Sequence, residues 1–304
     1  MSALDFVRSL LDAPLDPPIA SAPALRVFVA AASGDTAEQA VRGGRAAASL
    51  GWAFAAGYIA ALRRLDPALA SAGEIAALCA SEEGGAHPRA LRATLAARPG
   101  GGFLLTGDKA WVTLGREADT LLVVASTGQD EQGRNRLRAA RVPSTRAGVS
   151  VEPGAPLSFA PEIEHARVVL RGVPVAEAEL LPGDGYDAVL KPFRTIEDTH
   201  VVAATIAWAV GLARSHAWEP AWVERALALL VTLRGVAAAP PSRPETHLVL
   251  AGAMALGREL LDAAEWSKVP DATRALWLRD RPLLDVASRA RAARREAAWR
   301  DPSA

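Results

Sequence analysis

The sequence has almost nothing that could crosslink the chain. It contains one cysteine, Cys79, so no internal disulfide can form. Proteins of a reducing cytoplasm share this scarcity, and we expect a cytoplasmic protein. Because Cys79 lies in an apolar run from Ile75 to Ala80, we interpret it as a small core residue rather than a nucleophile.

The chain also lacks an excess of charge of either sign. Its 34 basic residues balance 34 acidic ones, and the net charge at pH 7 is zero. The arginine-rich stretch 274–300 also carries acidic residues and repeats apolar residues at helical spacing, so we interpret it as a solvated helix face. Nucleic-acid-binding proteins carry a basic excess or a basic patch. The sequence therefore predicts no nucleic-acid partner.

Long apolar runs are missing as well. Two uncharged runs, 46–62 and 201–213, are shorter than the ~20 residues that span a bilayer. They are rich in alanine and glycine, and we interpret them as buried helices, with no membrane span. The first residues lack the basic start and apolar block of a signal peptide, so we expect no secretion signal.

Metal-ligating and nucleophilic residues form no recognisable pattern. No G-x-S-x-G nucleophile elbow occurs, and Gly183-Asp184-Gly185 lacks the third glycine of a dinucleotide fingerprint. We therefore expect no metal site, and a serine–histidine–aspartate triad has no motif in its favour. The five histidines are scattered, with no pair at a metal-ligating spacing: His87, His165, His200, His216 and His247.

What the chain does have is a hydrophobic period that changes twice. Residues 1–78 have helical spacing and predict an N-terminal helical domain. Short strands separated by turns predict a middle antiparallel β-domain over 79–176. Helical spacing returns over 177–304 and predicts a C-terminal helical bundle. The expected fold class is therefore α+β in several parts, with four C-terminal helices near 187–214, 218–236, 245–266 and 271–299.

Strands are expected at intervals along the middle part. Phe103–Leu105 and Ala110–Thr113 are predicted to pair as a hairpin around a tight turn at Thr106–Lys109. Further strands are expected at 121–125, 135–142 and 166–170, with 172–175 leaving the sheet.

One stretch of this middle part has a distinctive order of residues. It contains a loop, then the hairpin, then an Ala-Asp pair: Ser81-Glu82-Glu83-Gly84-Gly85, Gly102-Phe103-Leu104-Leu105-Thr106-Gly107-Asp108-Lys109-Ala110-Trp111-Val112-Thr113 and Ala118-Asp119. This order resembles the acyl-CoA dehydrogenase family, whose members carry a T-E-P-x-x-G-S-D loop, a G-Y-x-L-N-G-x-K-x-W-I-T-N hairpin and A-D before a strand. Weaker matches at 45–65, 169–181 and 209–213 extend the resemblance into both helical parts.

The resemblance implies a flavin site with FAD as the cofactor. It implies that Trp111 lies against the isoalloxazine ring, that Thr113 hydrogen-bonds the ring's polar edge, and that Ser81 replaces the loop threonine. We expect Trp111 and Thr113 to point the same way, because residues two apart on a strand share a face. Lys109, at the expected turn, is predicted to point toward solvent. The alternative is a hairpin with a buried tryptophan and threonine and no ligand.

The chain departs from the family's motifs in places that bear on catalysis. Glu83 stands where the family has proline, and Ala86-His87-Pro88 replaces its G-S-D. The sequence stops about where the family's Q-x-x-G-G-x-G-Y segment, which often precedes the catalytic glutamate, begins. Some members carry the base on the first C-terminal helix, where Glu197 is the candidate here. Alternatively, Glu197 is an acidic residue that the helix dipole favours near a helix N-terminus.

The function implied by the resemblance is that of an FAD-dependent acyl-CoA dehydrogenase-like oxidoreductase, which carries out α,β-dehydrogenation of an acyl thioester. Two alternatives remain open: a non-catalytic subunit of a heteromeric enzyme of this kind, and a flavin-free interaction protein with the same fold. The sequence leaves open the acyl chain, the electron acceptor and whether the thioester is on CoA or on a carrier protein.

The C-terminal helices predict a homo- or hetero-oligomer. A helix that is apolar on much of its circumference needs cover on more than one side, and the family's tetrameric bundles provide such cover. The residues that extend the apolar surface of the third and fourth helices are Leu248, Leu250, Met254, Leu256, Leu260, Leu261, Leu276, Trp277, Leu283 and Leu284.

Overall fold

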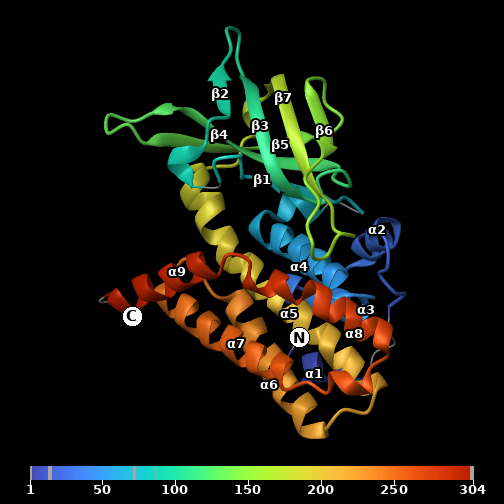
Figure 1. Ribbon diagram of the computed structural model, residues 1–304. Helices are drawn as coiled ribbons and strands as arrows, with labels where there is room; N and C mark the ends of the chain where they lie inside the picture. The colour runs from blue at the N-terminus through green and yellow to red at the C-terminus, as the bar shows by residue number, and fades with distance from the viewer. Residues whose placement is uncertain (1, 13–15, 71–72, 86, 302–304) are drawn as a thin grey trace. The chain divides into compact units, whose positions relative to one another are not determined.

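A computed structural model describes residues 2–12, 16–70, 73–85 and 87–301 (Figure 1). Helices come first, strands lie in the middle and helices return at the end, so the predicted fold class is confirmed. The chain divides into two compact units. A helical unit consists of Met1–Arg64, Ser158–Glu162 and Arg194–Ala304, and a sheet unit consists of Leu65–Leu157 and Ile163–Phe193.

Within the described residues, the sheet unit has seven strands in the order β1-β4-β2-β3-β7-β6, with β5 paired to β4. The β1–β4 and β2–β4 pairs are parallel, and the other pairs are antiparallel. No strand was expected at β1, β2 or β6. The strands are β1 (Ala76–Cys79), β2 (Thr94–Ala97), β3 (Phe103–Thr113), β4 (Thr120–Gln129), β5 (Asn135–Pro143), β6 (Val149–Pro153) and β7 (His165–Val175).

The strands form because their apolar residues alternate and meet on one face. On β7, Ala166, Val168 and Leu170 lie in the core of the sheet unit, whereas Arg167 and Arg171 belong to the opposite face. On β4, every residue of the predicted run 121–125 is buried, which is typical of a strand whose two faces are both covered. Residues of all the strands except β6 contribute to this core, against which Val149 and Val151 of β6 pack.

The predicted hairpin at 103–113 is wrong, because these residues form one strand, β3. Gly107, with a φ of 147°, interrupts the register with β7 at the place where a turn was expected. A Cβ on Gly107 would lie 2.6 Å from the Cα of Ala93, so this glycine allows a close approach of two segments rather than a chain reversal. The reversal lies between β2 and β3, where Arg98 N–H donates to Gly102 O at 3.0 Å.

The end of the predicted β-region also differs from the expectation. Residues 172–175 do not leave the sheet but continue β7 to Val175, where β7 pairs with Phe103 of β3. Gly172 has a φ of 59°, and the glycine that indicated an exit is a local irregularity within the strand.

The helical unit contains helices from both regions of the chain. The predicted fourth C-terminal helix at 271–299 is interrupted, because Pro282 has no N–H with which to continue an α-helix. No helix of the described residues is long and apolar enough to cross a membrane. The helices are α1 (Ala3–Asp12), α2 (Ala22–Ala31), α3 (Thr36–Ala46), α4 (Leu50–Leu65), α5 (Lys191–Ser215, whose first residues belong to the sheet unit), α6 (Pro220–Ala238), α7 (Pro244–Asp262), α8 (Asp271–Asp280) and α9 (Ser288–Arg300).

Two glycines bring the early helices against the backbone of α5. A Cβ on Gly44 of α3 would lie 2.1 Å from the carbonyl oxygen of Ala204. A Cβ on Gly57 of α4 would lie 2.8 Å from the carbonyl oxygen of His200. Neither distance can hold a methyl group, so α3 and α4 pack on α5 only because these positions have no side chain.

Gly44→Ala is expected to lower the free energy of unfolding by about 1–3 kcal/mol, because the added methyl overlaps the backbone of α5. Gly252→Ala on α7 is the matched control, since a Cβ there meets nothing within 4 Å. It is expected to raise the free energy of unfolding by roughly 0.5–1 kcal/mol, because alanine loses less backbone entropy in a helix. Urea unfolding measures both, and a Gly44→Ala protein as stable as wild type would contradict the close packing.

Candidate functional site

The loop at Ser81 lies directly beside β3. The backbone N–H of Ala110 donates to the carbonyl oxygen of Ser81 at 2.9 Å. The loop then turns at Glu82–Gly85, where the two residues exchange backbone hydrogen bonds of 3.2 and 2.8 Å. The structure therefore brings together the predicted loop residue Ser81 and the strand segment that carries Trp111. Of the replaced G-S-D segment, His87 is exposed, and Ala86 lies outside the described residues.

An ion pair that the sequence analysis missed lies under this junction. Lys109 Nζ lies 2.8 Å from Glu82 Oε1, and the side chains are 0% and 8% exposed. The Glu82 carboxylate also accepts the backbone N–H groups of Arg92 at 2.7 Å and Ala93 at 3.0 Å. The prediction that Lys109 points toward solvent is wrong, because Lys109 lies within β3 rather than at a turn.

The charges of this pair are set by burial and by their mutual contact. Burial lowers the pKa of Lys109, although the neighbouring Glu82 carboxylate opposes the shift. Burial alone would raise the pKa of Glu82, but the Lys109 ammonium and the two backbone N–H groups hold it below its usual value. The carboxylate thus stays ionised and draws β3, the loop and the start of β2 together.

Trp111 lies on a β-bulge next to this ion pair. Lys109 is opposite Val168 and Val112 is opposite Ala166, so β3 has one residue more than β7 in this interval. Trp111 itself has a φ of 58°, a left-handed conformation that is strained for a residue with a side chain. The bulge, residues 109–112, breaks the alternation of faces. The prediction that Trp111 and Thr113 point the same way is therefore not supported, since Trp111 is 49% exposed and Thr113 is 9% exposed.

The polar groups around the bulge suit a flat aromatic ligand with a polar edge. Within the described residues, neither the Ser81 hydroxyl nor the Thr113 hydroxyl has a hydrogen-bond partner. Trp111 offers a rigid indole, more than a third of it accessible. An isoalloxazine ring could take the apolar contact from the indole and hydrogen bonds from the hydroxyls. Trp111 and the hydroxyls of Ser81 and Thr113 thus fit a flavin.

Glu197 lies in the helical unit, two turns into α5. Burial and the nearby charge of Asp198 raise the pKa of Glu197 to about 7, against the opposing effect of three arginines. In the described part of the chain its carboxylate has no hydrogen-bond or ion-pair partner, and its side chain is half-buried. The helix dipole acts within the first turn and would lower the pKa, so it does not explain this glutamate.

The residue after Glu197 joins α5 to α9. Asp198 Oδ1 lies 3.1 Å from Arg291 Nε, and Asp198 Oδ2 pairs with Arg294. Arg294 also donates to the hydroxyl of Thr195 at 3.2 Å. The arginine-rich stretch, expected to be a solvated face, therefore uses Arg291 and Arg294 to bind α5. Three more of its arginines form ion pairs elsewhere: Arg274, Arg279 and Arg281.

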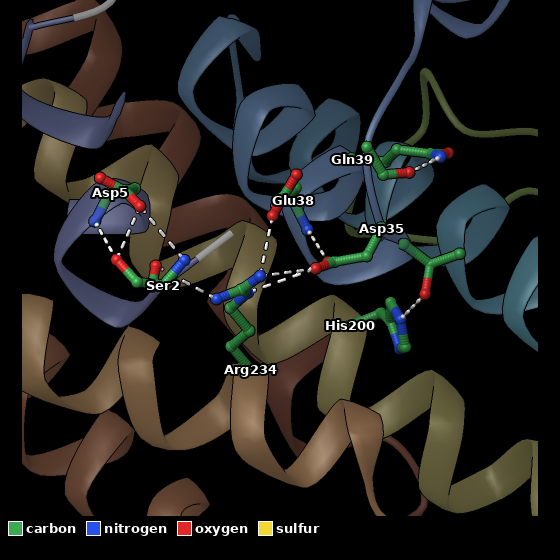
Figure 2. A network of polar contacts seen from close by, with 9 residues as sticks. Ser2, Asp5, Asp35, Glu38, Gln39, His200 and Arg234 are labelled. Carbon is green, nitrogen blue, oxygen red and sulfur yellow. Dashed lines mark hydrogen bonds and ion pairs between the residues drawn. The ribbon is translucent and has the colours of Figure 1, made fainter. Parts of the chain in front are cut away.

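The histidines of the described residues are not gathered with other metal-ligating side chains. No group of three or more His, Cys, Asp or Glu residues in the described ranges could hold a metal ion. His200 lies between the Ile196 carbonyl oxygen, 2.7 Å from Nδ1, and the Thr36 hydroxyl, 2.9 Å from Nε2. The contact of Nε2 is the dashed line at His200 in Figure 2. Burial lowers the pKa of His200 to about 4, so the ring is neutral at pH 7 and has a structural role.

A second network nearby is also structural. Figure 2 shows Arg234 of α6 reaching the carboxylates at the start of α3, with Nη2 at 2.9 Å from Asp35 and 3.0 Å from Glu38. Asp35 is at the same time the N-cap of α3, since it accepts the backbone N–H of Glu38 at 2.9 Å. The network fastens α3 to α6 and leaves no group free for catalysis.

Comparison with known proteins supports a relationship in the same part of the chain. Residues 76–173 match the family model of the acyl-CoA dehydrogenase middle domain. YngJ of Bacillus subtilis (strain 168), described as a probable acyl-CoA dehydrogenase, is 27% identical over 135 residues, which are 44% of this chain and 33% of the relative. The chain thus matches about one third of that relative's length.

Solved structures resemble the whole chain at low sequence identity. FMN-bound TdsC from Paenibacillus sp. A11-2 has a TM-score of 0.69 at 19% identity, over 98% of this chain and 95% of that chain. Butyryl-CoA dehydrogenase from Megasphaera elsdenii has a TM-score of 0.71 at 12% identity, over 98% of this chain and 97% of that chain. Residues 76–173 thus match the middle domain of the acyl-CoA dehydrogenase family, and the whole chain shares its fold with solved structures that include a butyryl-CoA dehydrogenase.

Proposed function

We propose that this chain is a flavin-dependent oxidoreductase that removes hydrogen from the α and β carbons of an acyl thioester. The observation that carries the proposal is the exposed indole of Trp111 on a strained bulge. Backbone strain of this kind costs about 1–3 kcal/mol and concentrates at functional sites. The Ser81 and Thr113 hydroxyls, free of partners in the described residues, add hydrogen-bonding groups beside it.

Trp111 of the bulge, with Thr113 and Ser81 beside it, would bind and orient the cofactor. Trp111 would lie against the flat ring, and Thr113 and Ser81 would hydrogen-bond its polar edge. FAD, when bound, supplies an acceptor for the hydride that leaves the β carbon. The FMN-bound relative supports a flavin in this fold, and the family's usual cofactor favours FAD.

Glu197 is our candidate for the base that removes the α proton. A carboxylate with a pKa of about 7 is basic enough to accept a proton and is partly deprotonated near neutral pH. The absence of a hydrogen-bond partner among the described residues leaves its oxygens free for that proton. Asp198, held by Arg291 and Arg294, keeps a negative charge nearby and so disfavours the ionised form of Glu197.

The test of the proposed function is whether the purified protein holds a flavin. We expect yellow protein with a flavin absorbance band, or apoprotein that takes up FAD more tightly than FMN. Reduction of the bound flavin by an acyl-CoA under anaerobic conditions then shows the dehydrogenation. Colourless protein that rejects both flavins would sink the proposal and favour the flavin-free interaction protein. Bound flavin that no acyl thioester reduces would favour the non-catalytic subunit.

Light scattering at micromolar concentration is expected to show an oligomer. On α7, Val249 and Leu256 are each 51% exposed and lie seven residues apart, on one face of the helix. Their joint replacement by aspartate is expected to lower the molar mass, because charges disfavour burial of this face. Leu104→Asp, at a 38% exposed leucine in the sheet unit, is the control and should leave the mass unchanged. A wild-type protein that is monomeric would refute this prediction.

A further inference from the structure

We infer that the buried Glu82–Lys109 ion pair is the positioning element of the Trp111 bulge, and that it sets flavin affinity without touching the flavin. The inference rests on the proposed function for its binding readout. It concerns residues that neither touch the ligand nor supply a reacting group.

The ion pair reaches three segments through one carboxylate. Glu82 follows Ser81 in the loop. Its carboxylate oxygens accept hydrogen bonds from the Lys109 ammonium and from the backbone N–H groups of Arg92 and Ala93, which precede β2. The loop in turn accepts the Ala110 N–H through the Ser81 carbonyl. Both residues on the N-terminal side of Trp111 are therefore fixed to the loop. On the C-terminal side, Val112 and Thr113 are fixed by their pairing with β7.

These attachments explain how Trp111 keeps a strained conformation. A left-handed residue with a side chain persists only where the surrounding structure over-determines it. The strand ladder alone does not do this, because the ladder is interrupted between Lys109 and Val112. The ion pair supplies the missing restraint. Without it, the bulge could relax and the indole would lose its fixed orientation, so binding would have to order it again.

The test compares the buried pair with a second ion pair of the same unit, Asp66–Arg141, in which the carboxylate is buried and the arginine is 30% exposed. Lys109→Met leaves the Glu82 carboxylate without its cation. Arg141→Met is the matched control. In wild type Arg141 Nε, on β5, lies 2.6 Å from Asp66 Oδ2, and the substitution leaves the 5% exposed Asp66 without its cation. A third protein, Glu82→Gln/Lys109→Met, has neither charge and so avoids an uncompensated buried charge. It decides the question if Lys109→Met fails to fold.

The first readout is the affinity for FAD, measured together with the melting temperature for each variant. We expect Lys109→Met to weaken FAD binding on the order of tenfold and Arg141→Met to leave it within about twofold, although both lower the melting temperature. The double variant is expected to regain melting temperature but not FAD affinity. If its affinity returns together with its stability, the pair is merely structural and the inference is overturned.

The second readout needs no flavin. The protein has eight tryptophans, and in 5-fluorotryptophan-labelled protein the Trp111 resonance is the one that Trp111→Phe removes. We expect the Trp111 resonance to be one sharp ¹⁹F line in wild type and in Arg141→Met, and to be broadened or divided in the double variant. If wild type binds neither FAD nor FMN, the proposed function fails while this line still tests the positioning. An unchanged Trp111 line in the double variant overturns the inference, whatever the flavin does.

Discussion

Trp111→Ala is expected to weaken FAD binding about a hundredfold, because it removes the large apolar contact proposed for the flavin ring. The indole is 49% exposed, so its loss leaves no large cavity in the core and should lower the melting temperature little. Flavin fluorescence titration and thermal unfolding on the same preparations measure both quantities. A Trp111→Ala protein with wild-type FAD affinity would contradict the proposed contact between the indole and the flavin ring.

Two comparisons make this result specific to the bulge. Thr113→Val keeps the shape of the side chain and removes one hydrogen bond, so we expect a loss of about 1 kcal/mol, or roughly fivefold in affinity. Trp299→Ala removes an indole that is 71% exposed on α9 and should leave FAD affinity unchanged. If all three variants lose the same amount of affinity, the loss reports general damage rather than a contact.

Glu197→Gln is expected to lower the rate of flavin reduction by an acyl thioester roughly 10²- to 10⁴-fold, the usual contribution of a general base. FAD affinity should not change, because Glu197 has no part in the proposed flavin contacts. Glu224→Gln, at an exposed position on α6, is the control and should keep the wild-type rate. Stopped-flow absorbance of the flavin band measures the rate, and a full rate in Glu197→Gln would remove this residue from the mechanism.

The pH dependence gives a second check on Glu197. A base must be deprotonated, so the wild-type rate should rise with pH through the pKa of Glu197, about 7. The contribution of Glu197 to the free energy of unfolding should instead fall as the pH rises. Because the pKa of the folded state lies above the usual 4.5, the folded protein holds the proton more tightly than the unfolded chain. The resulting stability is fully present below pH 4.5 and is lost as the pH rises to about 7. Glu197→Gln should remove this slope.

The candidate residues Ser81, Trp111 and Thr113 could be proposed from the sequence, but the bulge at 109–112 could not. The order of Ser81, Trp111 and Thr113 predicted one site, and the structure places the Ser81 loop beside the strand that carries the other two residues. Their role as a site stays a prediction. The register of β3 could not be read, because Gly107 produces a local irregularity that has the same sequence signal as a turn. The ion pair was equally hidden. Glu82 and Lys109 are 27 residues apart, and only the pairing of loop and strand makes them neighbours.

The helical part shows the same limit in another form. Hydrophobic spacing located the C-terminal helices apart from the break at Pro282, which divides the predicted fourth helix into α8 and α9. It could not show that α9 is fastened to α5, because the Asp198–Arg291 contact spans 93 residues and involves charges that the local pattern assigned to solvent. Glu197 was found only through the resemblance. That its carboxylate lacks a partner within the described residues depends on the folded arrangement of the unit, which the sequence does not show.

The composition of the helical unit has a consequence for synthesis. The first helices of this unit contact segments that are synthesised much later. Asp35 of α3, for example, binds Arg234, which is 199 residues further along the chain. A ribosome that adds ~5–20 residues per second leaves α3 and α4 without α5 and α6 for roughly ten to forty seconds. During that time the apolar surface of α4, buried along nearly its whole length in the finished protein, is open to other nascent chains and to chaperones. The yield of folded protein should therefore depend on translation speed and chaperone supply, independently of how stable the finished fold is.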